Sequence, residues 1–329
     1  MDKKKFILII ALFVVTIGAL LTVLILKDKF NKGPEISEEL RIARETFDIE
    51  LNSEGTEYVI YDLKSKANVD GATIYIPDTI DNLPVTKIYD KSNLSFAHYN
   101  KVASIVIGKN INYIGNYDKI TDTLYPYGYD IFASATKLSY IEVKLDNPTF
   151  KTIDGVLYNK DVTVLIKYPC AKVNTSGAYS SYTAPDTVEE VYQKAFYQNK
   201  MIAVVTFKES LSSIGVRAFS GCTELRQVYL SEGLTKISLY AFENCVSLAT
   251  IMLPSTVKTI ETNAFKGCLS LYEVIFNAIP TGLKRDVFTG CSLDNLYLKI
   301  DESLEVDFYH DLKNRGEDEL AARIMRIKK

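Results

Sequence analysis

The sequence predicts a solenoid in which each turn of about 23 residues contributes one short parallel β-strand. Three observations support this fold class. Five phenylalanines recur at one fixed spacing, and each copy ends in a short apolar alternation typical of a strand. A unit this small cannot bury its apolar side alone, so neighbouring turns must cover it. The clearest observation is a column of four cysteines, each 23 residues after the last: Cys222, Cys245, Cys268 and Cys291.

The phenylalanines predict how each turn is built. Alanine precedes the first four of them, and this Ala-Phe segment is too short for a long helix. It therefore predicts a single turn of α-helix or 3₁₀-helix followed by a bend. The strand that closes each copy should point one apolar column inward, formed by Val205, Val228, Ile251 and Val274. The phenylalanine column itself consists of Phe196, Phe219, Phe242, Phe265 and Phe288.

Weaker copies extend the pattern in both directions. Ile74 to Ile76 predicts a first, divergent copy. Further on, Ile111 and Ile114 match the first two apolar positions, and Phe132 and Ile141 match the phenylalanine and strand positions. The last copy is expected to be atypical, with its apolar residues one position early, at Leu293, Leu296 and Leu298.

Several segments of this chain resemble the BspA-type leucine-rich repeats of bacterial surface proteins. They are IGVRAFSGCTELRQVYL, ISLYAFENCVSLATIMLP and IETNAFKGCLSLYEVIF, and the resemblance covers roughly residues 74–298. Residues 147–169 look like the strand-rich insertion common in that family. The resemblance implies a leucine-rich-repeat stack that binds proteins or glycans outside the cell, including in adhesion.

The amino terminus predicts a membrane anchor. Residues 6–26 contain no charge and are long enough to span a bilayer as a helix. A cleaved signal peptide would need a shorter apolar region and a cleavage site, and a lipid anchor would need a nearby cysteine, so a retained signal anchor is favoured. Lysines on both flanks leave the charge rule nearly tied. The resemblance favours an inside amino terminus and an extracellular repeat domain.

The resulting domain organisation has five parts. Residues 1–5 form a short cytoplasmic tail, residues 6–26 the transmembrane anchor, and residues 27–50 a stalk or amino-terminal cap with a short helix after Pro34. The leucine-rich-repeat domain spans residues 51–300, with insertions near 115–131 and 145–170. Residues 301–329 have helix-forming composition and are expected to cap the open end of the stack, because a solenoid needs a covered edge for solubility.

Charge and cysteine content narrow the class of protein. The formal charge is −3, and residues 1–32 hold six Lys and two Asp, so the remainder carries −7. This acidic balance argues against a nucleic-acid partner. The five cysteines are odd in number, and four share one column, so we expect reduced, buried thiols rather than disulfides. A metal site is disfavoured because His98 and His310, the only histidines, lie outside that column.

No catalytic residue, cofactor site or metal site is predicted, because no motif for nucleophilic catalysis or phosphate binding occurs. A partner-binding face is predicted instead, on the outward side of the strands. One of its columns is largely apolar, and aligned outward apolar residues often mark contact sites. The alternative is a moderately apolar sheet face, either bare or covered by an insertion. The predicted partner-binding residues are Val204, Thr206, Gln227, Tyr229, Thr250, Met252, Glu273 and Ile275.

The sequence thus predicts a membrane-anchored, non-enzymatic cell-surface protein that binds an extracellular protein or glycan. A structural role is the alternative, as a scaffold for partner membrane or cell-wall proteins. An enzyme is the least favoured class, because only two histidines are present.

Overall fold

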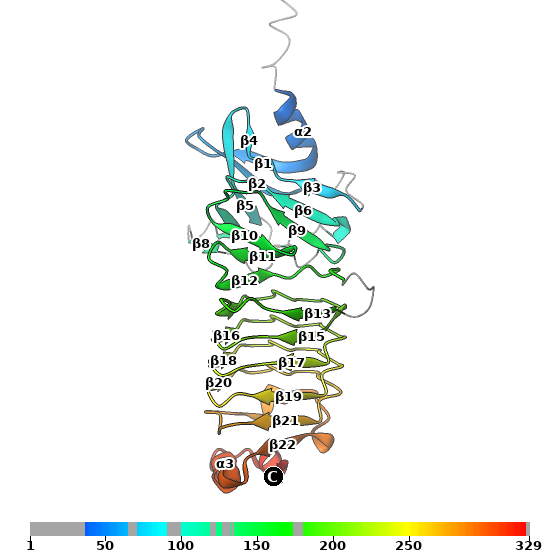
Figure 1. Cartoon of the computed structure of the whole chain (residues 1–329), viewed down its shortest axis with the longest axis vertical. Coiled ribbons are helices and arrows are strands. Elements are labelled where there is room, and N and C mark those ends of the chain that lie inside the picture. Colours follow the sequence, from blue (N-terminus) through cyan, green and yellow to red (C-terminus); the bar gives the residue numbers. More distant parts are fainter. Residues whose placement is uncertain are drawn as a thin grey trace, which may run out of the picture. The chain divides into compact units, whose positions relative to one another are not determined.

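The computed structural model describes residues 37–64, 71–90, 100–118, 123–126, 132, 135–173 and 180–326 (Figure 1). The chain divides into two compact units, residues 1–42 and residues 43–329. The membrane anchor predicted at residues 6–26 lies outside the described residues. Among the residues that are described, no helix has both the length and the apolar character needed to cross a membrane.

The first described element is helix α2 (Glu38–Thr46), where the sequence predicted a helix after Pro34. Ser37 caps it, because its Oγ accepts a hydrogen bond from the Leu40 N–H at 3.0 Å. Strand β1 (Phe47–Leu51) follows directly and pairs with β2 (Tyr58–Leu63). Residues 47–50, predicted as part of a stalk or cap, are therefore strand.

A mixed sheet occupies the beginning of the second unit. Its order is β1-β2-β5-β7-β8, with β4 also pairing with β5. The β2–β5 and β5–β7 pairs are parallel, whereas β7 and β8 form an antiparallel hairpin at the predicted insertion near 115–131. The additional strands are β4 (Thr79–Ile80), β5 (Leu83–Asp90), β7 (Tyr113–Asp118) and β8 (Thr123–Pro126).

The principal strands stack in parallel, one for each turn, as the sequence predicted. Figure 1 shows them following one another in sequence order from β13 to β22. They form three ladders: β3-β6-β9, β13-β15-β17 and β19-β21-β22-β23. Their bounds are β3 (Thr73–Tyr75), β6 (Ser104–Ile107), β9 (Tyr140–Val143), β13 (Ser180–Thr183), β15 (Ile202–Thr206), β17 (Gln227–Tyr229), β19 (Thr250–Leu253), β21 (Glu273–Phe276), β22 (Tyr297–Ile300) and β23 (Ile324–Arg326).

Most central turns also carry a second, two-residue strand, so the expectation of a single strand per turn was incomplete. These short strands form their own parallel ladder: β14 (Glu190–Val191), β16 (Ser213–Ile214), β18 (Lys236–Ile237) and β20 (Thr259–Ile260). The predicted insertion near 145–170 extends this ladder through β12, which pairs with β14. Its strands are β10 (Phe150–Ile153), β11 (Val156–Asn159) and β12 (Val164–Lys167).

The phenylalanine column forms the centre of the core. Its rings are fully buried and stack in succession. The centroid of Phe219 lies 4.6 Å from that of Phe196 and 5.1 Å from that of Phe242, with the latter pair inclined by only 4°. The segment before each of the first four rings is a series of turns with a left-handed residue, such as Arg217 (φ 55°) and Tyr240 (φ 57°). Before Phe288 the segment instead forms the 3₁₀ helix η2 (Arg285–Phe288).

The cysteine column has a bonding role as well as a packing role. Each thiol donates to the carbonyl of the phenylalanine in the preceding turn, as Cys245 Sγ does to Phe219 O at 3.1 Å. All the cysteines are free, and Cys222, Cys245 and Cys268 are buried, as predicted, whereas Cys291 is half-buried. Asn199 takes the same position one turn earlier, where its Nδ2 donates to Pro169 O at 2.9 Å. The thiols thus give a second hydrogen bond to buried carbonyls that already accept a backbone N–H, as Phe219 O does from Cys222 N–H at 3.0 Å.

The last turn corrects the predicted register. Leu298 pairs with Val274, and Ile300 pairs with Phe276, so the strand lies 24 residues after its predecessor. The apolar residues are therefore one position late rather than one position early. A 3₁₀ turn, η3 (Leu293–Asn295), occupies the extra length before the strand.

The carboxyl-terminal segment is helical only in part. It contains η4 (Glu302–Leu304), α3 (Glu305–Asn314) and α4 (Asp318–Ala321), followed by strand β23, which the sequence did not predict. Phe308, Leu312 and Leu320 are fully buried and belong to the same hydrophobic core as the repeats. Strand β23 pairs in parallel with β22.

Candidate ligand-binding face

The outward side chains of β15, β17, β19 and β21 form a surface that we call the strand face. Alternation along each strand places it there, because Val205, Val228 and Ile251 point inward and are buried. Among the predicted outward residues, Tyr229 and Met252 are exposed large apolar side chains, with exposed fractions of 52% and 53%. Gln227 is also exposed, and the others are half-buried: Val204, Thr206, Thr250, Glu273 and Ile275.

Strand register gathers the predicted residues into two groups. In the first, Val204 pairs with Gln227 and Thr206 with Tyr229. In the second, Thr250 pairs with Glu273 and Met252 with Ile275. In the described part of the chain, the ladder that contains β17 ends there, and a separate ladder begins at β19. Backbone pairing is therefore continuous within each group and interrupted between β17 and β19, although these two strands remain neighbours in space.

The polar groups of the strand face are mostly satisfied within it. The Tyr229 hydroxyl donates to Gln227 Oε1 at 3.0 Å. The Glu273 carboxylate forms an ion pair with Lys299 on β22, and only 16% of the Glu273 side chain is exposed. This pairing neutralises the charge of Glu273. The eight predicted residues therefore present apolar and uncharged polar groups together with one compensated charge.

Two residues of the strand face escaped the sequence prediction. Tyr297 on β22 is 41% exposed and pairs with Glu273, while Lys299 pairs with Ile275. The alternation Tyr-Leu-Lys-Ile at 297–300 indicates a strand with Tyr297 and Lys299 on its outward side. The sequence prediction missed these residues because it placed the last copy in the wrong register relative to β21. The strand face therefore continues at least one strand further than predicted.

The insertions do not extend the ladders of the strand face. Strands β10, β11 and β12 join the ladder of short strands, and the β7–β8 hairpin joins the mixed sheet. Much of the tyrosine-rich segment near 117–129 lies outside the described residues. The high exposure of Tyr229 and Met252 indicates that the described insertion strands leave the middle of the strand face open.

The buried thiols do not form a reactive site. Burial raises the pKa of Cys222, Cys245 and Cys268 far above the usual value, and it raises that of Cys291 to about 11 although two backbone N–H groups oppose the shift. These thiols are therefore protonated at neutral pH and poorly nucleophilic. Across the described ranges, no group of three or more His, Cys, Asp and Glu residues is placed to hold a metal ion.

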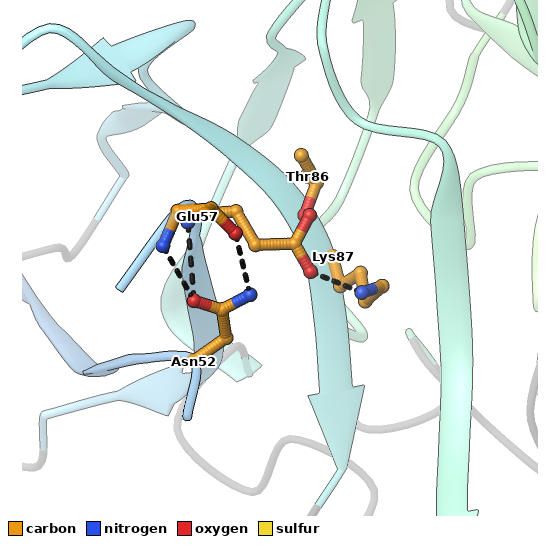
Figure 2. A network of polar contacts seen from close by, with 5 residues as sticks. Asn52, Glu57, Thr86 and Lys87 are labelled. Atoms are coloured by element: carbon orange, nitrogen blue, oxygen red, sulfur yellow. Dashed lines mark hydrogen bonds and ion pairs between the residues drawn. The ribbon is translucent and has the colours of Figure 1, made fainter. Parts of the chain in front are cut away.

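A separate polar network lies in the mixed sheet (Figure 2). Figure 2 shows the Glu57 carboxylate between Thr86 and Lys87 of strand β5. Thr86 Oγ1 donates to it at 2.8 Å, and Lys87 forms an ion pair with it. Asn52 Oδ1 accepts from the Glu57 N–H at 3.3 Å and from the Thr56 N–H at 2.8 Å. Burial raises the pKa of Glu57, but the bonds from Lys87 and Thr86 and the attraction of Lys87 outweigh it, so the pKa is lowered. The network fastens the β1–β2 loop to β5.

Comparisons with known proteins agree with this architecture. A family model described as a BspA type leucine rich repeat region matches residues 174–307 in six copies. The search of curated proteins finds no match. Among solved structures, the pneumococcal vaccine antigen PcpA is similar at 19% identity over 83% of this chain and 84% of that chain, with a TM-score of 0.51.

A second solved structure, a leucine rich cell surface protein from Faecalibacterium prausnitzii, is 16% identical over 82% of this chain and 95% of that chain, with a TM-score of 0.48. At these identities the likeness to PcpA bears on the fold alone, whereas the family model matches the repeated sequence itself. Residues 174–307 of this chain therefore match the repeated sequence of a BspA type leucine rich repeat region.

Proposed function

We propose that this chain is a bacterial cell-surface protein that binds an extracellular protein or glycan through its strand face. The observation that carries the proposal is the contrast within the principal strands. The inward positions repeat nearly the same apolar residues, whereas Tyr229 and Met252 stand half exposed on the outward side. Contiguous apolar and aromatic surface rimmed by polar groups marks interaction sites in soluble domains.

The chemistry of the strand face suits an uncharged or weakly charged epitope. Tyrosine supplies a large, rigid contact area and a hydroxyl for hydrogen bonding, and methionine adapts its shape to a partner. The ion pair of Glu273 with Lys299 leaves little net charge for long-range attraction. Affinity should therefore rest on buried contact area and vary little with salt concentration.

Anchoring in the membrane is part of the proposal. The uncharged segment 6–26 supports it, and an external solenoid follows if the amino terminus stays inside. The pneumococcal relative is described as a vaccine antigen and the Faecalibacterium relative as a cell surface protein, so the proposed placement is consistent with the names of similar proteins. Protease digestion of intact cells should remove the repeat region and leave a short membrane fragment.

We also propose that residues 301–326 cap the stack. The burial of Phe308 and Leu312 in the repeat core and the pairing of β23 with β22 support this role.

The test of binding uses the full chain in detergent, immobilised and exposed to extracellular matrix proteins and to a glycan array. The variant Tyr229→Ala/Met252→Ala should lose the captured ligand. A matched control is Leu145→Ala/Tyr309→Ala, which removes exposed apolar side chains outside the strand face. Equal capture by both double variants would refute the assignment of binding to the strand face. Capture of membrane partners alone would favour a scaffold.

A further inference from the structure

A cleft lies beside the last turn, and most of its lining comes from the segment that connects β21 to β22. We call it the end cleft; its volume is about 620 Å³, within the range of small-molecule sites. The turn that carries Phe288 forms most of it, and the residue before α4 closes it from the carboxyl-terminal segment. Its lining is Lys284, Arg285, Asp286, Phe288, Thr289, Gly290, Cys291, Leu293 and Glu317.

Two of the charged residues in the end cleft are already engaged. The Arg285 guanidinium pairs with Glu319, with Nε 3.0 Å from Oε2. The Arg285 N–H donates to Glu317 Oε2, also at 3.0 Å. These contacts fix Glu317 at the wall of the cleft. Glu319 neutralises Arg285, whereas Glu317 keeps its charge, so a ligand meets Lys284, Asp286 and Glu317.

Asp286 presents an incompletely satisfied carboxylate. Its Oδ2 accepts from Thr262 Oγ1 at 3.1 Å, whereas its Oδ1 is buried and has no hydrogen-bond partner among the described residues. A buried carboxylate oxygen without a donor is costly, so a cationic or N–H donor group of a ligand would be favoured beside it. The torsion that rotates the Asp286 carboxylate has a broad energy minimum, so this rotation can turn either oxygen toward the cleft.

Lys284 supplies the opposite charge. Its side chain is exposed and forms no ion pair with the rest of the described chain. Lys284 and Asp286 line both the end cleft and a neighbouring depression of about 260 Å³, so they stand on the wall between the two. Half-buried Leu293 and Cys291 supply the apolar part of the lining.

We propose that the end cleft binds a zwitterionic ligand with an apolar side chain, namely a free apolar amino acid or the equivalent end of a short peptide. The ligand ammonium pairs with Asp286, its carboxylate pairs with Lys284, and its side chain lies against Leu293 and Cys291. This site is independent of the strand face, so its failure would leave the proposed macromolecular binding untouched.

The test is a titration of the full chain in detergent with L-leucine, followed by saturation-transfer NMR. Asp286→Asn keeps the shape and the acceptor for Thr262 but removes the charge, and Lys284→Gln removes the cation. Each should weaken leucine binding by about tenfold, the usual effect of losing a charge-assisted contact. The matched control is Lys258→Gln, an exposed lysine of the preceding turn, which should bind like the parent.

Ligand analogues assign each contact without depending on the folding of a variant. N-acetyl-leucine should bind more weakly and be indifferent to Asp286→Asn, while leucinamide should be indifferent to Lys284→Gln. Sensitivity of N-acetyl-leucine to Asp286→Asn would overturn the assignment of the ammonium contact. Absence of leucine binding to the parent chain, or equal binding by the parent and both variants, would overturn the site.

Discussion

The inward and outward sides of the same strands obey different rules. Inward positions keep one residue type through successive turns, as the stacked rings of Phe219, Phe242 and Phe265 show. Outward positions change from turn to turn, from Thr206 to Tyr229 across one paired register. Stacking explains the difference, because an inward side chain packs against the equivalent side chains of the two neighbouring turns. An outward side chain faces solvent or a partner. The inner columns therefore hold the fold together, and the outer face is free to determine binding.

The largest expected effect comes from breaking an inner column. Phe242→Ala should lower the free energy of unfolding by about 3–5 kcal/mol, since it removes a buried ring stacked on both sides. Denaturant unfolding measures the total loss, and hydrogen exchange should locate it in the turns adjacent to residue 242 first. The outer-face control, Tyr229→Ala, should change stability little. An unfolding free energy equal to that of the parent would contradict the role of the phenylalanine column.

A smaller effect is expected in the cysteine column. Cys245→Ala should cost about 1 kcal/mol, because it leaves a small cavity and a carbonyl of Phe219 without its thiol donor. The half-buried Cys291 provides the comparison, and Cys291→Ala should cost less. Thermal unfolding of the two variants side by side measures the difference. A greater loss at Cys291 would show that burial does not govern this column.

The smallest effect concerns the mixed sheet, where no column repeats. The folded pKa of Glu57 lies below its usual value of 4.5, so its stabilising contribution is present above that value. It is lost as the pH falls through the lower, folded pKa. Glu57→Gln should therefore destabilise the mixed sheet by about 1 kcal/mol or less at neutral pH and by nothing in strong acid. Hydrogen exchange at the Lys87 amide checks this, and a difference that grows on acidification would contradict it.

The repeats could be predicted from the sequence to the extent that their spacing was constant. The registers of Val205, Val228 and Ile251 followed from the 23-residue period, and the structure places all of these side chains inside. The short ladder was missed because a strand of two residues, such as β16, buries one apolar side chain and shows no alternation. The strand of the last turn was predicted in the wrong register because the last copy is one residue longer than 23. The added residue leaves the alternation of apolar residues intact, so the sequence pattern does not reveal the shift.

The remaining features depend on contacts that no period encodes. The Glu57–Lys87 pair joins residues 30 apart in the sequence, in the part of the chain where the repeat is most divergent. The break between β17 and β19 has no marker in a sequence whose spacing there is regular. The eight residues of the strand face were predictable in orientation, but the neutralisation of Glu273 by Lys299 required the three-dimensional register.

The most direct test of the account measures stability and affinity on the same two variants. Once a ligand is captured, Tyr229→Ala should weaken its binding by about 1–2 kcal/mol while leaving the free energy of unfolding nearly unchanged. Cys245→Ala should do the reverse, lowering stability and leaving affinity unchanged at temperatures where the variant is folded. Full affinity in Tyr229→Ala and in Met252→Ala, together with loss of binding after replacement of the tyrosines at 125–129, would contradict the claim that the strand face binds the ligand.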